Sequence, residues 1–231
     1  MHQKKTIPSG FEAIDDHLGG GYKSGTLFIA RSREIEQDEL QDFIIAQIKQ
    51  LTVGNKTKLL VASLGMNCKE FVKCIVWDST PEQLRLLNSS TLFLTDMNPR
   101  EKGDYLKLIG QLRDFIEEWD VDLLIIDSAE NLAPGNTEVV EGLLDTEVVE
   151  GLLNLAQETG VPIIVSDYED ELEVGYPRDN RVTEMEIKTD INDTVQASIL
   201  SNEKKTISED LYGLWKVFEG ILKTEPGKKR E

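Results

Sequence analysis

Two carboxylates end apolar runs of this chain and could do chemistry there. Asp127 follows the apolar residues 123–126, and Asp167 lies two residues after the run 163–165. Such runs are typical of strands buried in a parallel sheet, and open α/β sheets place their chemistry at the carboxyl ends of those strands. A carboxylate at a strand end is also a common cap of the following turn. An enzyme that uses Asp127, Asp167 or Glu169 is therefore one hypothesis.

The order of residues near the N-terminus is a second feature. Gly10 and Phe11 are followed by Asp15, a glycine-rich turn at residues 18–21 and an apolar stretch at residues 27–30. This succession resembles the entry of the RecA-like fold in DnaB-type replicative helicases and KaiC-type ATPases. The resemblance extends to about residue 200 and implies a three-layer α/β sandwich, with a mostly parallel central sheet and helices on both faces. It also implies a relationship to proteins of DNA replication.

In that family the phosphate-binding loop follows the first core strand, which here puts it at residues 31–38. A working loop needs glycines whose N–H groups wrap the phosphates, a lysine that reaches them and a Ser or Thr hydroxyl for Mg²⁺. This chain instead has Arg31, Ser32, Arg33, Glu34, Ile35, Glu36, Gln37 and Asp38. Gln37 stands in the place of the lysine, and Asp38 in the place of the hydroxyl residue. We therefore expect a vestigial loop and no cofactor, with ATP and Mg²⁺ bound only if the loop works in a non-standard way.

The charges of this loop also oppose phosphate binding. Glu34, Glu36 and Asp38 would place negative charge at a helix N-terminus, whose partial positive charge otherwise attracts phosphate. Arg31 and Arg33 could hold an anion. The interpretation that we adopt is that they form surface salt bridges with the neighbouring glutamates.

The residues that would activate water and metal are also changed. Residues 63–66 read Ser-Leu-Gly-Met and resemble a Ser-Leu-Glu-Met stretch of DnaB helicases, whose glutamate polarises the attacking water. Gly65 stands in that place and has no side chain to do so. Asp127 resembles the Walker B carboxylate, which helps to hold Mg²⁺ in the family. Without a phosphate loop, its expected role is to cap the next turn.

Later parts of the resemblance are incomplete as well. Asp167 replaces the glutamine of a Ser-Gln sensor pair, and residues 178–185 are similar to an arginine-containing stretch that precedes a strand at residues 195–200. The Lys-x-Arg finger that acts across the subunit boundary is absent from residues 202–208, where only Lys204 and Lys205 are cationic. The resemblance therefore implies that catalysis across subunits is lost.

Hydrophobic periodicity gives the elements that must position these residues. Strands are predicted at residues 26–30, 58–62, 91–95, 122–127, 162–167 and 195–200. Helices are predicted at residues 38–51, 68–77, 104–119, 137–159 and 208–222. Alternating strands and helices predict one domain over residues 1–222. Residues 223–231 are expected to be a flexible charged tail, and residues 208–222 to dock on the body or on a neighbouring subunit.

A near-repeat lies inside the helix predicted at residues 137–159. Residues 137–145 recur as residues 146–154 with only the last residue changed, from Asp145 to Asn154. A shift of nine positions at roughly 100° each turns the second copy to the opposite helix face. We therefore expect the second copy to pack on the sheet and the first to be an exposed extension.

Composition narrows the possible environments and partners. The 231 residues include 43 acidic and 25 basic ones, a net charge of −18 that repels a nucleic-acid backbone. No apolar run approaches the ~20 residues that cross a bilayer, and no signal peptide is recognisable, which favours the cytoplasm. Two cysteines, Cys68 and Cys74, and two histidines are too few and too badly spaced for a metal site or a local disulfide.

Three functions follow from these observations. The first is a catalytically degenerate RecA-like domain, a pseudo-ATPase that acts as a binding or regulatory protein through a protein partner or self-association. The second is an active ATP-dependent helicase or recombination ATPase with a non-standard phosphate loop. The third is an unrelated enzyme that uses the carboxylates at the sheet edge. The first explains three losses at once, those of the phosphate loop, the catalytic glutamate and the cross-subunit finger, whereas Gln37, Asp38 and Gly65 speak against the second.

Overall fold

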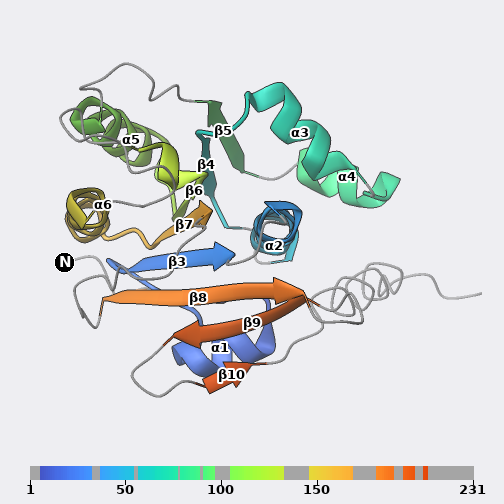
Figure 1. The fold of residues 1–231 in the computed structure, drawn as a ribbon. Helices are drawn as coiled ribbons and strands as arrows, with labels where there is room; N and C mark the ends of the chain where they lie inside the picture. Colours follow the sequence, from blue (N-terminus) through green and yellow to red (C-terminus); the bar gives the residue numbers. More distant parts are fainter. Residues whose placement is uncertain are drawn as a thin grey trace, which may run out of the picture.

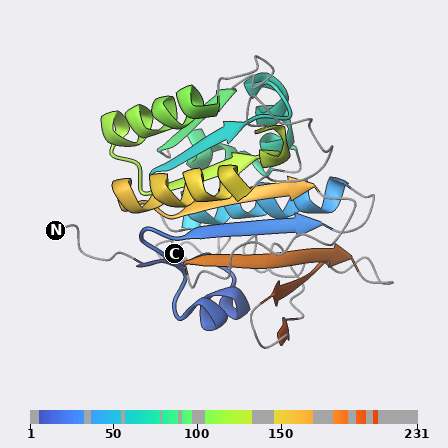
Figure 2. The ribbon, with the colours of Figure 1, turned by 60° about the vertical axis from the view of Figure 1, so that its left-hand side comes forward.

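A computed structural model describes residues 6–32, 37–54, 57–77, 79–88, 91–96, 105–132, 146–168, 181–189, 195–200 and 205–207. It has three layers, with a central sheet between two layers of helices (Figures 1 and 2). The fold class expected from the sequence is therefore confirmed, and the arrangement is that of a RecA-like α/β sandwich.

The central sheet has eight strands in the order β10-β9-β8-β3-β7-β6-β4-β5. They are β3 (Leu27–Ser32), β4 (Leu59–Ser63), β5 (Leu92–Asp96), β6 (Leu123–Asp127), β7 (Ile163–Tyr168), β8 (Val182–Thr189), β9 (Val195–Leu200) and β10 (Lys205–Ile207). The six strands from β8 to β5 are parallel, and β9 and β10 are antiparallel to their neighbours. Two short strands, β1 (Thr6–Ile7) and β2 (Tyr22–Lys23), form a separate antiparallel pair.

Helices cover both faces of the sheet. One face carries α1 (Glu12–Leu18), α2 (Gln37–Lys49), α3 (Cys68–Val76) and α4 (Pro81–Asn88), and the other carries α5 (Tyr105–Trp119) and α6 (Thr146–Thr159). A π-helical turn, Gln50–Gly54, continues α2, and a short 3-10 helix, Ala129–Asn131, follows β6.

Two hydrophobic cores result from this layering, because successive side chains of a strand point to opposite faces. Leu27 and Ile29 of β3 belong to the core under α5 and α6, whereas Phe28 and Ala30 belong to the core under α2. The strands β3, β4 and β6 are buried along their whole length. Their continuous apolar character is what a sheet covered on both faces requires.

Side-chain caps explain where α3 and α4 begin. Asn67 accepts a hydrogen bond from the backbone N–H of Glu70 at 3.0 Å, which satisfies a free donor of the first turn of α3. Thr80 and Gln83 form a reciprocal capping box before α4, with distances of 3.2 Å and 2.7 Å. Pro81, at the first position of α4, needs no N–H partner there.

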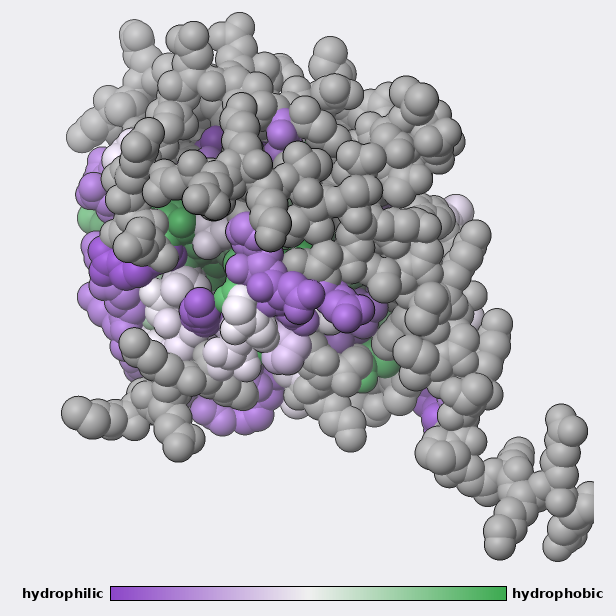
Figure 3. Space-filling view, turned by 90° about the horizontal axis from the view of Figure 1, so that it is seen from below, coloured by the Kyte–Doolittle hydropathy of each residue, from purple (hydrophilic) through white to green (hydrophobic). Residues whose placement is uncertain are grey.

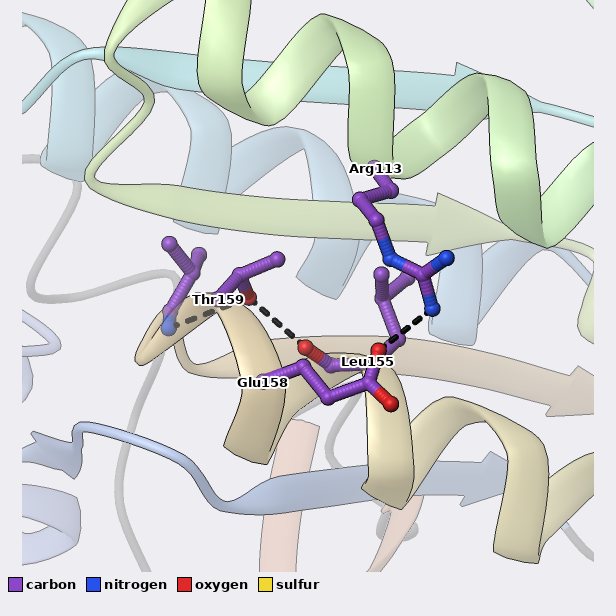
Figure 4. A network of polar contacts seen from close by, with 5 residues as sticks. Arg113, Leu155, Glu158 and Thr159 are labelled. Carbon is purple, nitrogen blue, oxygen red and sulfur yellow. Dashed lines mark hydrogen bonds and ion pairs between the residues drawn. The ribbon is translucent and has the colours of Figure 1, made fainter.

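Polar contacts join α5 to α6 and close the end of α6 (Figure 4). The guanidinium of Arg113 on α5 forms an ion pair with Glu158 on α6. The hydroxyl of Thr159 donates to the carbonyl of Leu155 at 2.7 Å and accepts from the N–H of Val161 at 3.4 Å. These bonds satisfy backbone groups that the end of a helix leaves unpaired.

The predicted strands all exist, with bounds within one or two residues of those expected. The second copy of the near-repeat begins α6, and its Val148, Val149, Leu152 and Leu153 are buried, as predicted. Residues 137–145, 208–222 and 223–231 lie outside the described residues. Cys68 and Cys74 are free thiols.

Some elements were not expected. Residues 178–185 were read as a stretch that leads to a strand, but Val182–Thr189 is itself a strand that pairs in parallel with β3. Helices α1 and α4 were also missed, because each is short and has few apolar positions.

The surface of the described part is mainly hydrophilic when seen from below, with small hydrophobic areas between polar ones (Figure 3). Among the described residues, none of the helices combines the length and the apolar character that a bilayer-spanning helix needs.

Candidate functional site

The carboxyl ends of the parallel strands bring several predicted site residues to one edge of the sheet. Ser63 at the end of β4 lies directly opposite Asp127 at the end of β6. Ile126 lies opposite Val165, which places Asp127 beside Ser166 of β7. Arg31 of β3 lies opposite Asp167 of the same strand β7.

The alternation of side chains divides these residues between the two faces. Asp127 continues the series of Leu123 and Ile125, which face α2. Arg31 continues the series of Leu27 and Ile29, which face α5 and α6. The edge therefore holds two separate polar clusters, which we call the Asp127 cluster (Ser63, Asp127, Ser128, Ser166) and the Arg31 cluster (Arg31, Asp167, Glu184, Glu186).

Hydroxyl groups surround the carboxylate of the Asp127 cluster. The Ser166 hydroxyl donates to Asp127 Oδ1 at 3.1 Å, and the Ser63 hydroxyl donates to Oδ2 at 3.4 Å. Asp127 is only 1% exposed. Its pKa is raised above the ordinary value because burial disfavours the charged form, and the hydrogen bonds from Ser166, Ser63 and Ser128 offset part of that effect.

Backbone groups fix the two serines in place. The Ser128 N–H donates to the Ser166 hydroxyl at 2.8 Å, and the Met66 N–H donates to the Ser63 hydroxyl at 3.3 Å. The Leu64 N–H donates to the Asp127 carbonyl at 3.0 Å. The side chain of Asp127 therefore bonds to hydroxyls of Ser63 and Ser166 on neighbouring strands. A further hydrogen bond joins Asp127 to Ser128, the first residue of the following turn, where the sequence suggested a cap.

Gly65 lies next to this cluster, in the bend that follows β4. A Cβ atom added at Gly65 would lie 2.5 Å from the hydroxyl oxygen of Ser128 and 3.0 Å from its Cβ. Ser128 has a left-handed backbone conformation, with φ 63° and ψ 51°. The first atom of any side chain at position 65 would thus meet Ser128, so a longer acid there needs Ser128 to move.

The Arg31 cluster places one arginine among three carboxylates. Arg31 Nε lies 3.2 Å from Asp167 Oδ2, and Arg31 Nη1 lies 3.9 Å from Glu184 Oε2. Glu186 of β8 lies directly opposite Arg31 in the sheet register. Arg31 and Asp167 are 6% and 0% exposed.

This arrangement corrects the expectation for Arg31. The sequence suggested a surface salt bridge with neighbouring glutamates of the loop, but Arg31 is buried and pairs with residues of β7 and β8. The reason is topological, because β3 lies between these two strands and both flank its last residues. The guanidinium of Arg31 therefore forms its ion pairs with carboxylates inside the protein.

The rest of the predicted phosphate loop is only partly described. Ser32 ends β3 and is buried, and Gln37 and Asp38 open α2. Residues 33–36, which include Arg33, Glu34, Ile35 and Glu36, lie outside the described residues, as does Glu169. The strand, the connection and the helix thus follow one another in the order that a phosphate-binding loop requires.

Sequence reasoning missed the partners of the two buried charges. Ser63 and Ser166 were noted only as neighbours of changed positions, and Glu184 and Glu186 were not considered. Serines at the ends of two predicted parallel strands were an available signal for the first pair. No signal pointed to the glutamates, because the strand that carries them was not predicted.

Within the described ranges, no group of three or more His, Cys, Asp or Glu side chains has an arrangement suited to a metal ion. No protein-family model matches the chain, and no curated protein matches it significantly.

Proposed function

We propose that this protein is a catalytically degenerate RecA-like domain, a pseudo-ATPase that acts by binding a protein partner or another copy of itself. The observation that carries the proposal is the junction of β3 and α2. A phosphate loop belongs between these two elements, yet Gln37 and Asp38 open the helix and no glycine precedes them in residues 31–36. Gln37 and Asp38 stand where a working loop has the lysine and the hydroxyl that hold phosphate and Mg²⁺.

The surroundings of the junction support the same proposal. Gly65 has no side chain to orient water, and Ser128 occupies the space that a side chain at position 65 would need. Arg31, a cation at the end of β3, is paired with Asp167. Asp127 is buried, and both of its carboxylate oxygens accept hydrogen bonds from serine hydroxyls.

The first prediction is that ATP and Mg²⁺ leave the melting temperature of the purified protein unchanged. A ligand at 100 times its Kd stabilises a folded protein by about 2.7 kcal/mol, so millimolar ATP would reveal any Kd of about 10 μM or less. The measurement is a thermal melt with ATP, ADP and a non-hydrolysable analogue, each with and without Mg²⁺. A Mg²⁺-dependent shift would favour the ATPase hypothesis over the proposal. An active RecA-like ATPase in the same buffer is the positive control.

A further inference from the structure

An outward face of α3 carries apolar side chains that nothing in the described part of the chain covers. Five large hydrophobic side chains of the described residues are exposed, and four of them, Val72, Val76, Trp77 and Leu84, lie on the consecutive helices α3 and α4 or at their junction. Trp77 is 74% exposed. We call these four residues the α3/α4 patch.

The patch has the geometry of one helix stripe. Positions 69, 72, 73, 76 and 77 are spaced as i, i+3, i+4, i+7 and i+8, so Lys69, Val72, Lys73, Val76 and Trp77 share one face. The buried residues of α3, Phe71 and Ile75, lie on the other side of the helix. The stripe therefore faces away from the core.

The backbone beneath Trp77 is held firmly although the indole is exposed. Its N–H donates to the Lys73 carbonyl at 2.9 Å, and its carbonyl accepts from Lys49 Nζ of α2 at 3.4 Å. Tryptophan also has only two side-chain torsions, so a partner that covers its large ring orders few degrees of freedom. This is the property that makes tryptophan frequent at the centre of interfaces.

The chain itself contains a segment with the complementary character. Residues 208–222 carry Leu211, Leu214, Trp215, Phe218 and Leu222, which share one face if the segment is helical. Acidic residues accompany this stripe at positions 209, 210 and 219. In a protein of net charge −18, Lys69 and Lys73 of α3 are exposed cations on this face and can attract such an acidic segment.

The sheet order decides which copy of the segment can reach the patch. The chain reaches residue 208 directly after β10, at one edge of the sheet, whereas α3 packs beside β5 at the other edge (Figure 1). Six strand spacings of about 4.8 Å separate β10 from β4, roughly 29 Å in all. Leu211 is four residues after Ile207, the end of β10, so it lies at most about 14 Å from that strand. The segment cannot lay its whole stripe on the patch of its own copy.

We propose that residues 208–222 of a second copy of this chain dock as an amphipathic helix on the α3/α4 patch. Each copy has one patch and one segment, so two copies can exchange their segments and form a closed dimer. Each contact can form on its own, and the second contact of a closed dimer forms within the complex, so the two together hold the dimer more tightly than one.

The test uses the full-length chain and sedimentation at about 100 μM protein. We expect the wild type to sediment as a species heavier than the 26.0 kDa monomer, and Trp77→Asp and Trp215→Asp each to sediment as monomers. The control is Leu106→Asp on α5, since Leu106 is also 74% exposed but lies on the opposite face of the sheet. Melting curves verify that each variant is folded.

Mixing the two variants separates this proposal from a general loss of association. Trp77→Asp keeps an intact segment and Trp215→Asp keeps an intact patch, so an equimolar mixture should form a 1:1 complex that neither variant forms alone. A synthetic peptide of residues 208–222 should likewise bind Trp215→Asp and not the double variant. A monomeric wild type, a dimeric Trp77→Asp, a monomeric Leu106→Asp or a mixture without complex would each overturn the proposal.

Discussion

At the scale of single residues, Arg31 and Asp167 form a buried ion pair at the edge of the sheet. Arg31→Met should lower the free energy of unfolding by about 3 kcal/mol, because it leaves the fully buried Asp167 without its cation. Urea denaturation measures the change. The control is Arg113→Met, which removes an exposed ion pair of α5 and α6 and should cost about 0–1 kcal/mol. Equal costs for the two variants would show that the buried pair contributes no more than a surface pair.

Asp127 is a second buried charge, and its amide variant should be more stable. Its pKa is raised by burial, so the ionised form that is present at neutral pH disfavours the folded state. In Asp127→Asn the amide can accept from Ser166 and donate to Ser63, and we expect a gain on the order of 1 kcal/mol at pH 7. The gain is fully present above the raised pKa and is lost as the pH falls through it toward the ordinary value of about 3.9.

Urea denaturation of both proteins between about pH 8 and pH 3.5 measures this difference. Asp127→Ala is the control, because it leaves the hydroxyls of Ser63 and Ser166 without their acceptor and should destabilise at every pH. A loss of stability in Asp127→Asn that matches the alanine variant would show that the negative charge itself is needed for the fold.

The sequence predicted the position of Asp127 but not its partners, and it placed Arg31 in a surface loop although Arg31 is buried in β3. The end of an apolar run can be read from the sequence, so Asp127 could be placed at the edge of a sheet. Which strands flank it depends on the strand order, and that order depends on long-range packing. Ser63 and Ser166 meet Asp127 because β6 lies between β4 and β7, and Arg31 meets Asp167 because β3 lies beside β7.

At the scale of elements, periodicity predicted those that are long and strongly apolar. Strands such as β4 and β6 are apolar throughout, and α5 has buried residues at regular helical spacing, so each was found. In contrast, β8 alternates charged Glu184 and Glu186 with buried Met185 and Ile187. Neither glutamate was considered from the sequence, yet both lie on the side of β8 that faces Arg31, and Glu184 forms an ion pair with it.

The contact of α5 with α6 gives a prediction at this scale, since Gly151 of α6 lies against Tyr105 of α5. A Cβ at Gly151 would lie 1.6 Å from the Tyr105 hydroxyl oxygen, which donates to the carbonyls of Glu147 at 3.1 Å and Val148 at 3.3 Å. Gly151→Ala should therefore lower the free energy of unfolding by about 1–3 kcal/mol, as the ring moves and its hydrogen bonds are lost.

A matched glycine lies in the middle of α5. A Cβ at Gly110 would meet nothing within 4 Å, so Gly110→Ala should stabilise the protein by about 0.5–1 kcal/mol through higher helix propensity. Replacing Tyr105 with Phe removes the clashing hydroxyl, so the double variant of Gly151→Ala and Tyr105→Phe should recover stability relative to Gly151→Ala alone. Thermal melts of the four proteins measure these changes. Stabilisation by both alanines would show that helix propensity outweighs the Tyr105 contact.

At the scale of the whole molecule, hydrophobic packing determines the fold, whereas net charge determines which partners the surface attracts. The two hydrophobic cores on the faces of the sheet define the fold, and they follow from the hydrophobic periodicity of the sequence. The net charge of −18 does not define the fold but determines which macromolecules the surface attracts. A phosphate backbone is repelled, whereas a cationic site such as that around Lys69 and Lys73 is open to acidic partners.

We therefore predict no measurable binding of DNA, although the sequence led us to expect a relationship to proteins of DNA replication. Binding to a phosphate backbone depends on the release of counterions by lysines and arginines, and a surface with a large acidic excess cannot supply it. A titration of labelled single-stranded and duplex oligonucleotides with up to about 10 μM protein at 50 mM salt tests this prediction. A variant with Lys228, Lys229 and Arg230 replaced by glutamine separates weak attraction by these basic residues from binding by the folded body. Tight binding that persists in this variant and weakens steeply with salt would reveal a basic surface on the folded domain and contradict the prediction.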